Sequence, residues 1–203
     1  MRRAKKQGEM ISRQQVRQMI RSHDLATREL KMLTFVNGGN LSISGAVGGI
    51  TSNIQQGDNV SGRTGYQINV HSVKMWFQAS MNALANVDRF RYILFYDRLN
   101  TGTPPTVADV LDTAVVISDY AYFARTQNRY KILVDKTVPM SISGNSRAVN
   151  YEHEFKFKNT VTVDSLGTTT NHGRNSFYYL VMGDLSVNNS TYAISCTVRY
   201  FDD

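Results

Sequence analysis

An alternation of apolar and charged residues constrains this chain more than any other feature of its sequence. It is clearest over residues 151–158, where Tyr151, His153, Phe155 and Phe157 alternate with Glu152, Glu154, Lys156 and Lys158. Successive side chains of a β-strand point to opposite faces, so this spacing predicts a half-buried strand with its apolar face inward. A period of two recurs from about residue 31 onward, which predicts a body built from strands.

Eight segments of this body fit a strand: 31–36, 66–71, 73–82, 89–97, 131–138, 151–158, 177–183 and 192–200. The segment 177–183 is apolar on both faces, so we expect it at the centre of a sheet. About eight strands joined by irregular loops favour an all-β sandwich or barrel over a βαβ fold. A length of 203 residues suits one sizeable domain with a short appendage.

Two parts of the body do not follow the strand pattern. Residues 38–62 are rich in Gly, Ser and Asn, and we expect a long connection around one or two weak strands. After Pro104-Pro105, the residues Thr106-Val107-Ala108-Asp109 resemble a capping box. They predict a short helix that ends at about Leu111.

The positive charge of the chain is concentrated at its N-terminus. The formal net charge is +7, and residues 1–31 carry nine basic and three acidic side chains, which leaves +6 on that segment and +1 on the rest. A basic arm on a near-neutral body is the pattern expected for electrostatic capture of a polyanion. The alternatives are a solvated tail and a localisation address. The candidate nucleic-acid-binding residues are Arg2, Arg3, Lys5, Lys6, Arg13, Arg17 and Arg21.

The arm also has a helical pattern. Ser12 and Gln15 fit a capping box, and Val16, Met19, Ile20 and His23 follow at the spacing of one helical face, with Arg13, Arg17 and Arg21 on another. An isolated helix of about 12 residues is marginal in water. We therefore expect it to order when its apolar face meets partner helices or when its arginines meet phosphates. The predicted division is a basic arm over residues 1–30 and a body over 31–203.

Motifs for catalysis are weak in this chain. Residues 57–64 nearly spell a phosphate-binding loop, but Arg63 replaces the lysine and a strand pattern follows where a helix is needed. No two of the four histidines have ligand spacing, and on a strand His153 points away from Glu152 and Glu154. Cys196 falls on an apolar strand face, as an inert packing residue does. We expect no enzyme activity.

No apolar run approaches the roughly 20 residues of a membrane helix, so we expect no membrane partner. Three further carboxylates are of interest: Asp58 and the pair Asp202-Asp203. On the sequence alone they suit a turn and a solvated C-terminus. Oxygen donors of this kind would bind calcium if other carboxylates and carbonyls converged on them.

The residues also carry a resemblance that extends through most of the chain. It is strongest in Asn-Thr-Gly-Thr-Pro-Pro-Thr-Val at 100–107 with Val110 and Leu111, and it fades over 145–190. It includes the segments 16–23, 36–40, 56–58, 63–65, 89–97 and 129–135. In their order and spacing these segments resemble the capsid proteins of the satellite tobacco necrosis virus family. They are also similar to single jelly-roll capsid proteins of small circular single-stranded DNA viruses.

The resemblance implies an eight-stranded antiparallel jelly-roll sandwich that self-assembles into a T = 1 icosahedral shell. The basic arms would lie inside the shell against a single-stranded RNA or DNA genome, and the arm helices would gather around the threefold axes. The protein would be a component of the virion. The host receptor and the compartment of assembly are not indicated by the sequence.

The resemblance further implies calcium ions between subunits. Carried over by position, Glu29 and Asp202 would supply carboxylates to one site, together with the backbone carbonyls of Thr64 and Gln67. Asp58 would be the ligand on the threefold axis, and the Ser143 carbonyl the ligand on the fivefold axis. Carboxylate and carbonyl oxygens are the donors that calcium prefers.

Two other functions fit the same sequence features. One is a stand-alone nucleic-acid-binding β-barrel with a basic tail, which would remain a small species in solution. The other is a jelly-roll lectin or receptor-binding domain, whose sugar affinity would survive deletion of residues 1–28.

Overall fold

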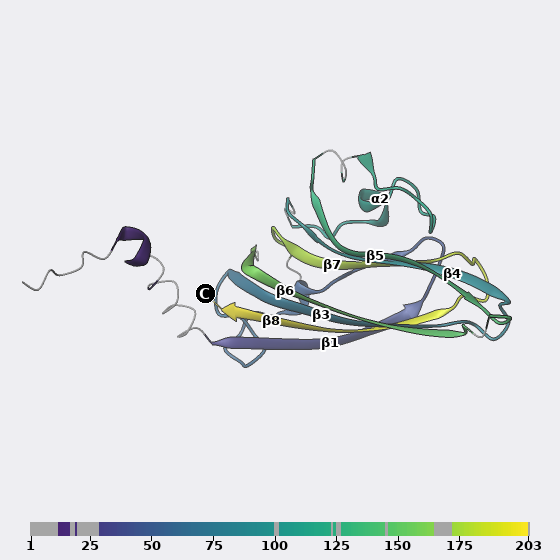
Figure 1. Ribbon diagram of the computed structural model, residues 1–203, viewed down its shortest axis with the longest axis horizontal. Helices are drawn as coiled ribbons and strands as arrows, with labels where there is room; N and C mark the ends of the chain where they lie inside the picture. The colour runs from purple at the N-terminus through teal and green to yellow at the C-terminus, as the bar shows by residue number, and fades with distance from the viewer. Residues whose placement is uncertain are drawn as a thin grey trace, which may run out of the picture.

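Figure 1 shows the computed structural model of the chain, a two-layered β-sandwich. The structure describes residues 12–16, 19, 29–99, 102–122, 124, 127–144, 146–164 and 172–202. No helix within these residues is long and apolar enough to cross a membrane.

The elements follow one another in the order β1 (Leu30–Asn40), β2 (Ala46–Gly49), η1 (Thr51–Asn53), β3 (Gln67–Ser80), β4 (Val87–Asp97), α2 (Val107–Val110), β5 (Tyr130–Ser141), β6 (Ala148–Asp164), β7 (Ser176–Gly183) and β8 (Thr191–Asp202). The short helix α2 begins with the predicted capping box. Thr106 Oγ1 accepts a hydrogen bond from the Asp109 N–H at 3.3 Å, and Asp109 Oδ2 accepts one from the Thr106 N–H at 2.7 Å.

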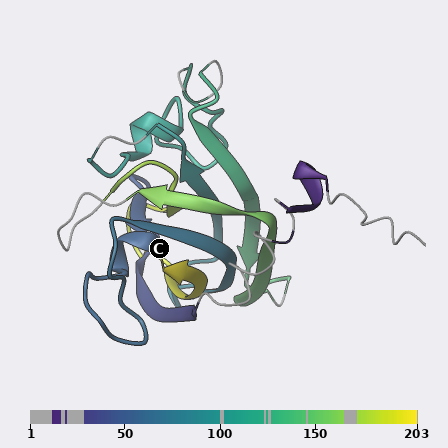
Figure 2. The same ribbon diagram turned by 90° about the vertical axis from the view of Figure 1, so that its left-hand side faces the viewer.

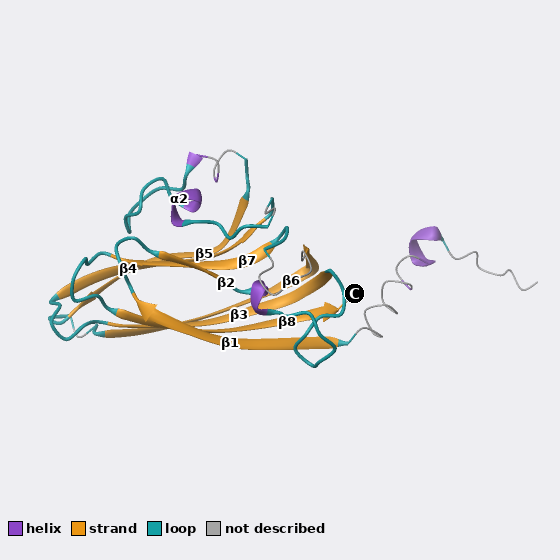
Figure 3. Cartoon of the chain, turned by 180° about the vertical axis from the view of Figure 1, so that it is seen from behind, coloured by secondary structure: helices purple, strands orange, loops and turns teal. Residues whose placement is uncertain are grey.

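The strands form two four-stranded sheets. The first sheet has the order β1-β8-β3-β6 and the second the order β2-β7-β4-β5. Every pair of neighbouring strands is antiparallel. Figure 3 shows the sheets stacked as two layers. Eight strands in two such sheets, with the first and last strands adjacent, make a jelly roll, so the predicted fold class is confirmed.

The space between the sheets holds the main core, built from the inward positions of both sheets. Aromatic rings stack at its centre: Phe77 of β3 lies 4.5 Å from the ring of Tyr92 and 5.3 Å from that of Phe90, both of β4. Such pairs add about 0.5–1.5 kcal/mol to the free energy gained by burying their area. Cys196 is fully buried among these side chains, as its place on the apolar face of its strand predicts.

A second core lies on the outer side of the second sheet. All eight residues of β7 are buried, because the segment that contains α2 covers the face turned away from the first sheet (Figure 1). Arg91 of β4 links this covering segment to the sheet. Its guanidinium donates to both carboxylate oxygens of Asp135, at 2.8 and 2.6 Å. It also donates to the Val116 and Ser118 carbonyls of the covering segment. β7 lies between β2 and β4, so its predicted central place is confirmed.

The structure differs from the predicted strands most clearly at β3, and β1 and β6 are longer than the segments predicted for them. The segments 66–71 and 73–82 form a single strand, β3, in which His71 is an extra residue relative to β8. The bulge shifts the alternation by one: Ile68 and Val70 face the core before it, and Val73 and Met75 after it. That shift in phase is the reason why the pattern indicates two strands. The eighth strand is β2, within the connection predicted over 38–62.

We predict that Phe77→Ala will destabilise the sandwich by about 3–5 kcal/mol, because it removes the ring shared by the aromatic stack and leaves a cavity. Denaturant unfolding of the purified chain measures the loss. Leu84→Ala is the control, since Leu84 is 77% exposed, and its effect should stay within about 0.5 kcal/mol. Equal stabilities of the two variants would contradict a core centred on Phe77.

Candidate functional site

The first candidate site is the N-terminal arm, which begins a helix where the sequence predicts one. The Ser12 Oγ accepts from the Gln15 N–H at 3.2 Å, and the Gln15 Oε1 accepts from the Ser12 N–H at 2.8 Å. Residues 13–16 are helical, and the Val16 N–H donates to the Ser12 carbonyl at 3.0 Å. The two reciprocal side-chain bonds satisfy free amides at the helix start, which confirms the predicted capping box.

The described arm residues are exposed. Val16 and Met19, two members of the predicted apolar face, are 38% and 51% exposed, and Arg13 is exposed as well. The other predicted arm residues lie outside the described residues: Arg2, Arg3, Lys5, Lys6, Arg17, Ile20, Arg21 and His23. Nucleic-acid binding by the arm therefore stays a prediction.

The second candidate site lies at the root of the arm, where β1 begins beside the end of β8 (Figure 2). The ladder pairs Leu30 with Phe201, so Glu29 and Asp202 lie at the same end of neighbouring strands. Asp202 is nearly buried. Its Oδ2 accepts from the Lys31 ammonium at 3.0 Å, from the Thr64 N–H at 2.7 Å and from the Thr64 hydroxyl at 2.9 Å.

The electrostatics of this cluster favour an ionised carboxylate. Burial alone would raise the pKa of Asp202, but the bonds from Thr64 and Lys31 outweigh it and hold the pKa below its ordinary value. A second cation, the buried Arg63, lies nearby and donates to the Gly65 carbonyl. Burial lowers the pKa of Arg63, and the charge of Asp202 opposes that effect. Asp202 Oδ1 is buried and has no hydrogen-bond partner among the described residues.

The other predicted calcium ligands are not gathered into one site within the chain. Asp58 is exposed in the loop before β3, Gln67 begins β3 and donates from Nε2 to Asp164 at 2.8 Å, and Ser143 lies in the turn after β5. The structure brings Thr64 to Asp202, but through its donor groups. Across the described residues, no three His, Cys, Asp or Glu side chains form a group that could hold a metal.

The motifs that resemble catalytic sites have structural explanations. In the loop over 57–64, the Gly57 N–H donates to the Arg63 carbonyl and the Gly62 N–H to the Asn59 carbonyl, so these amides are not aimed at a phosphate. A strand, β3, follows the loop, as predicted. Burial raises the pKa of the Cys196 thiol to about 12, which leaves it without a reactive thiolate.

The alternation around His153 is also confirmed. His153 points into the core, where its Nε2 is 2.7 Å from the Tyr92 hydroxyl. Glu152 and Glu154 point to the opposite face of β6 and pair with the ammonium groups of Lys74 at 2.7 Å and Lys156 at 3.5 Å. The three residues cannot share a metal ion.

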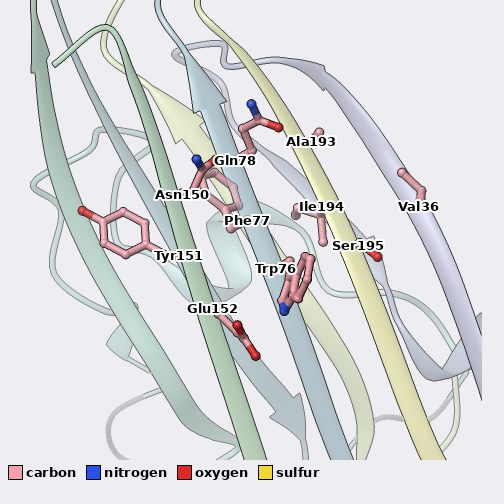
Figure 4. A pocket seen from close by; sticks show the side chains of 10 residues that line it. All are labelled: Val36, Trp76, Phe77, Gln78, Asn150, Tyr151, Glu152, Ala193, Ile194 and Ser195. Atoms are coloured by element: carbon pink, nitrogen blue, oxygen red, sulfur yellow. The ribbon is translucent and has the colours of Figure 1, made fainter.

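A third site, which the sequence did not indicate, is a groove on the outer face of the first sheet (Figure 4). It has a volume of about 510 Å³, and its most prominent side chain is Trp76, which is 54% exposed. Lys74 lies 5.0 Å from the indole ring, and Val36 and Glu152 line the sides. The alternation over residues 73–82 could have indicated that Trp76 is exposed, because Trp76 shares its strand face with Lys74 and Gln78 and not with the core residues.

The family model described as "Satellite tobacco necrosis virus coat protein" matches residues 2–203. The chain belongs to this coat-protein family. The capsid protein of Satellite tobacco necrosis virus 1 is 32% identical over 173 residues, which cover 83% of each chain. The coat protein of Satellite tobacco necrosis virus 2 is 28% identical over 203 residues, 98% of each chain.

The family makes this chain a viral coat protein, a structural component of the virion and not an enzyme. The coat protein of Maize white line mosaic Satellite virus is also similar, at 28% identity over 89% of this chain and 84% of the relative. Among solved structures, the 60-mer BFDV capsid protein superposes with a TM-score of 0.34 and 6% identity, over 87% of this chain and 94% of that chain. At that score the superposition adds nothing to the strand order described above.

Two histidines of this coat protein are held in surroundings that disfavour the proton. Burial lowers the pKa of His153, and the Lys136 ammonium of β5 lowers it further; Tyr92 of β4 and Tyr151 of β6 also face the ring. Burial likewise lowers the pKa of His172, whose Nδ1 lies 2.9 Å from the Tyr178 hydroxyl. The unfolded chain, with histidine pKa values near 6.5, therefore binds these protons more readily than the folded chain.

We predict that the stabilisation from the two neutral histidines is complete above about pH 6.5 and is lost as the pH falls through their folded pKa values. Denaturant midpoints measured from about pH 7.5 to pH 5 should fall with acidification. The slope should be shallower in His153→Gln and shallower still when His172→Gln is added. An unchanged slope in the double variant would show that other groups cause the acid sensitivity.

Proposed function

We propose that this coat protein self-assembles into a small T = 1 icosahedral shell and packages a single-stranded genome through its basic N-terminal arm. The observation that carries the proposal is the division of charge, +6 on residues 1–31 and +1 on the remainder, in a chain of a coat-protein family. A near-neutral body can pack beside copies of itself without strong repulsion. The charge of the arm needs a partner outside the chain, and a polyanion supplies it.

Residues 1–30 form the arm in this proposal, and residues 31–203 form the shell domain. The start of β1 at Leu30 supports the boundary. The exposure of Val16 and Met19 supports a partner for the apolar face of the arm helix, because a short isolated helix is marginal in water. Arm helices of neighbouring copies, gathered at a threefold axis, are the partner that we propose, with the arginine face turned to the genome.

The cargo is single-stranded RNA or DNA, since both present phosphates that a basic arm can neutralise. We also propose calcium at the symmetry axes, bound by Asp58 on the threefold and by the Ser143 carbonyl on the fivefold. Both residues are exposed, and each supplies so few oxygens that several copies must converge to complete a calcium shell of six to eight ligands.

We predict that Arg13→Gln, Arg17→Gln and Arg21→Gln together will strongly reduce the nucleic acid that co-purifies with the protein. With about six phosphate contacts per arm, the log–log salt slope of oligonucleotide binding should be near −4, and the triple variant should bring it to about −2. The control removes three exposed body cations instead, through Arg147→Gln, Lys156→Gln and Lys158→Gln, and should leave the slope near −4.

Electron microscopy of the purified protein, before and after nuclease treatment, tests the shell itself. Closed particles of one size are the expected result. Small species at high concentration, with oligonucleotide binding intact, would instead favour the stand-alone nucleic-acid-binding β-barrel. An equal loss of binding in the arm variant and in the control would place the nucleic-acid contacts outside the arm.

A further inference from the structure

We infer that the ammonium group of Lys31 takes the place beside Asp202 that the family resemblance gives to calcium. Lys31 is the second residue of β1, and its side chain is turned inward, with only 6% of it exposed. Its Nζ donates to Asp202 Oδ2 at 3.0 Å and to the Gly62 carbonyl at 3.2 Å. The carboxylate at the end of β8 thus has a counter-ion that belongs to the same chain.

The groups that surround Asp202 Oδ2 are hydrogen-bond donors, which stabilise an anion and not a cation. Calcium needs six to eight oxygen acceptors that converge on one point. Here three donor groups converge on Oδ2 instead, the ammonium of Lys31 and the N–H and hydroxyl of Thr64. The Thr64 carbonyl, the proposed metal ligand, accepts from the Gln56 amide at 3.5 Å.

The balance of charge leads to the same conclusion. Among the buried side chains here, the Asp202 carboxylate lies with two cations, Lys31 and Arg63, so these three groups carry a net positive charge before any metal enters. A divalent cation would add two more positive charges in a place where water screens poorly. The surroundings therefore disfavour calcium at this position.

The second oxygen of the Asp202 carboxylate accepts none of these hydrogen bonds. Asp202 Oδ1 is buried and has no hydrogen-bond partner among the described residues. Glu29, which directly precedes β1, is exposed. The donors at Oδ2 and the buried cations beside it, and not the number of oxygens in one chain, disfavour the metal here. The predicted ligand set of Glu29, Thr64, Gln67 and Asp202 does not fit the metal in this chain.

The replacement of a bound calcium ion by the Lys31 ammonium has a structural consequence. Its two bonds join the start of β1 to the end of β8 and to the loop over 57–64, at the point where the arm leaves the sandwich. A covalently attached cation cannot dissociate, whereas a bound ion can. The root of the arm should therefore keep its geometry when calcium is withdrawn.

A double-mutant cycle on the purified protein tests the pairing. Lys31→Met and Asp202→Asn each leave one buried charge without its partner and should each lower the Tm by roughly 10 °C, while the double variant should lose clearly less than the sum. The exposed pair Lys74 and Glu152 is the matched control. Lys74→Met and Glu152→Gln should each change the Tm by no more than about 2–4 °C. Additive losses at Lys31 and Asp202 would overturn the inference.

A second measurement does not depend on whether Lys31→Met folds. Thermal unfolding of the parent protein and of Asp202→Asn is followed in calcium chloride and in the chelator EGTA. An unchanged Tm of the parent protein, or a chelator effect of equal size in both proteins, supports the inference. An effect that disappears in Asp202→Asn would overturn it. A chelator effect that is equal in the parent protein and in Asp202→Asn, but disappears in Asp58→Asn, would assign the calcium to the threefold axis instead.

Discussion

β1 and β8, the first and last strands, lie side by side over their whole length, from Leu30 opposite Phe201 to Asn40 opposite Thr191. The rest of the structure depends on this pairing. It adds β1 to the edge of the first sheet, covers the inner core from one side, and brings the start of β1 and the end of β8 to one end of the sandwich (Figure 2). Pairing of such distant segments forms slowly, because the loop-closure entropy must be met before the contacts stabilise it. A contact that secures this end, such as Lys31 with Asp202, acts where the sheet is most exposed to fraying.

Local sequence patterns predicted much of this fold. The strand spacing located most of the strands, the capping boxes at Ser12 and Thr106 located two helix starts, and the alternation around His153 placed the ring in the core. Each of these features is decided by residues within a few positions of one another. The bulge at His71 was missed because one extra residue reverses which face the following residues occupy, and only the partner strand defines that residue as extra.

The site at the arm root could not be predicted for a related reason. In the sequence, Lys31 is one of nine cations of a basic segment, and nothing near it distinguishes it from the others. Its partner is 171 residues away and its burial results from the ladder between β1 and β8. In the structure Thr64 lies beside Asp202, but position along a chain does not specify whether a residue presents its carbonyl or its donors. Carbonyl oxygens would favour a bound cation beside Asp202, whereas donor groups stabilise the Asp202 carboxylate itself.

The same burial changes how the charge of the arm should be counted. Lys31 is neutralised by Asp202, so it contributes little to the field around the arm, and the cations that can meet phosphates come before it. On the outer face of the first sheet, Lys74 is paired with Glu152, and Glu154 lies near both Lys156 and Arg199. Trp76 stands among these paired charges in its groove. These three cations and two carboxylates nearly balance, so the face attracts a polyanion weakly and can approach another protein surface with little repulsion. The near-neutral sandwich therefore leaves most of the excess positive charge to the arm, +6 on residues 1–31 against +1 on the rest. That arrangement would let a coat protein contact its own copies and its cargo through different surfaces.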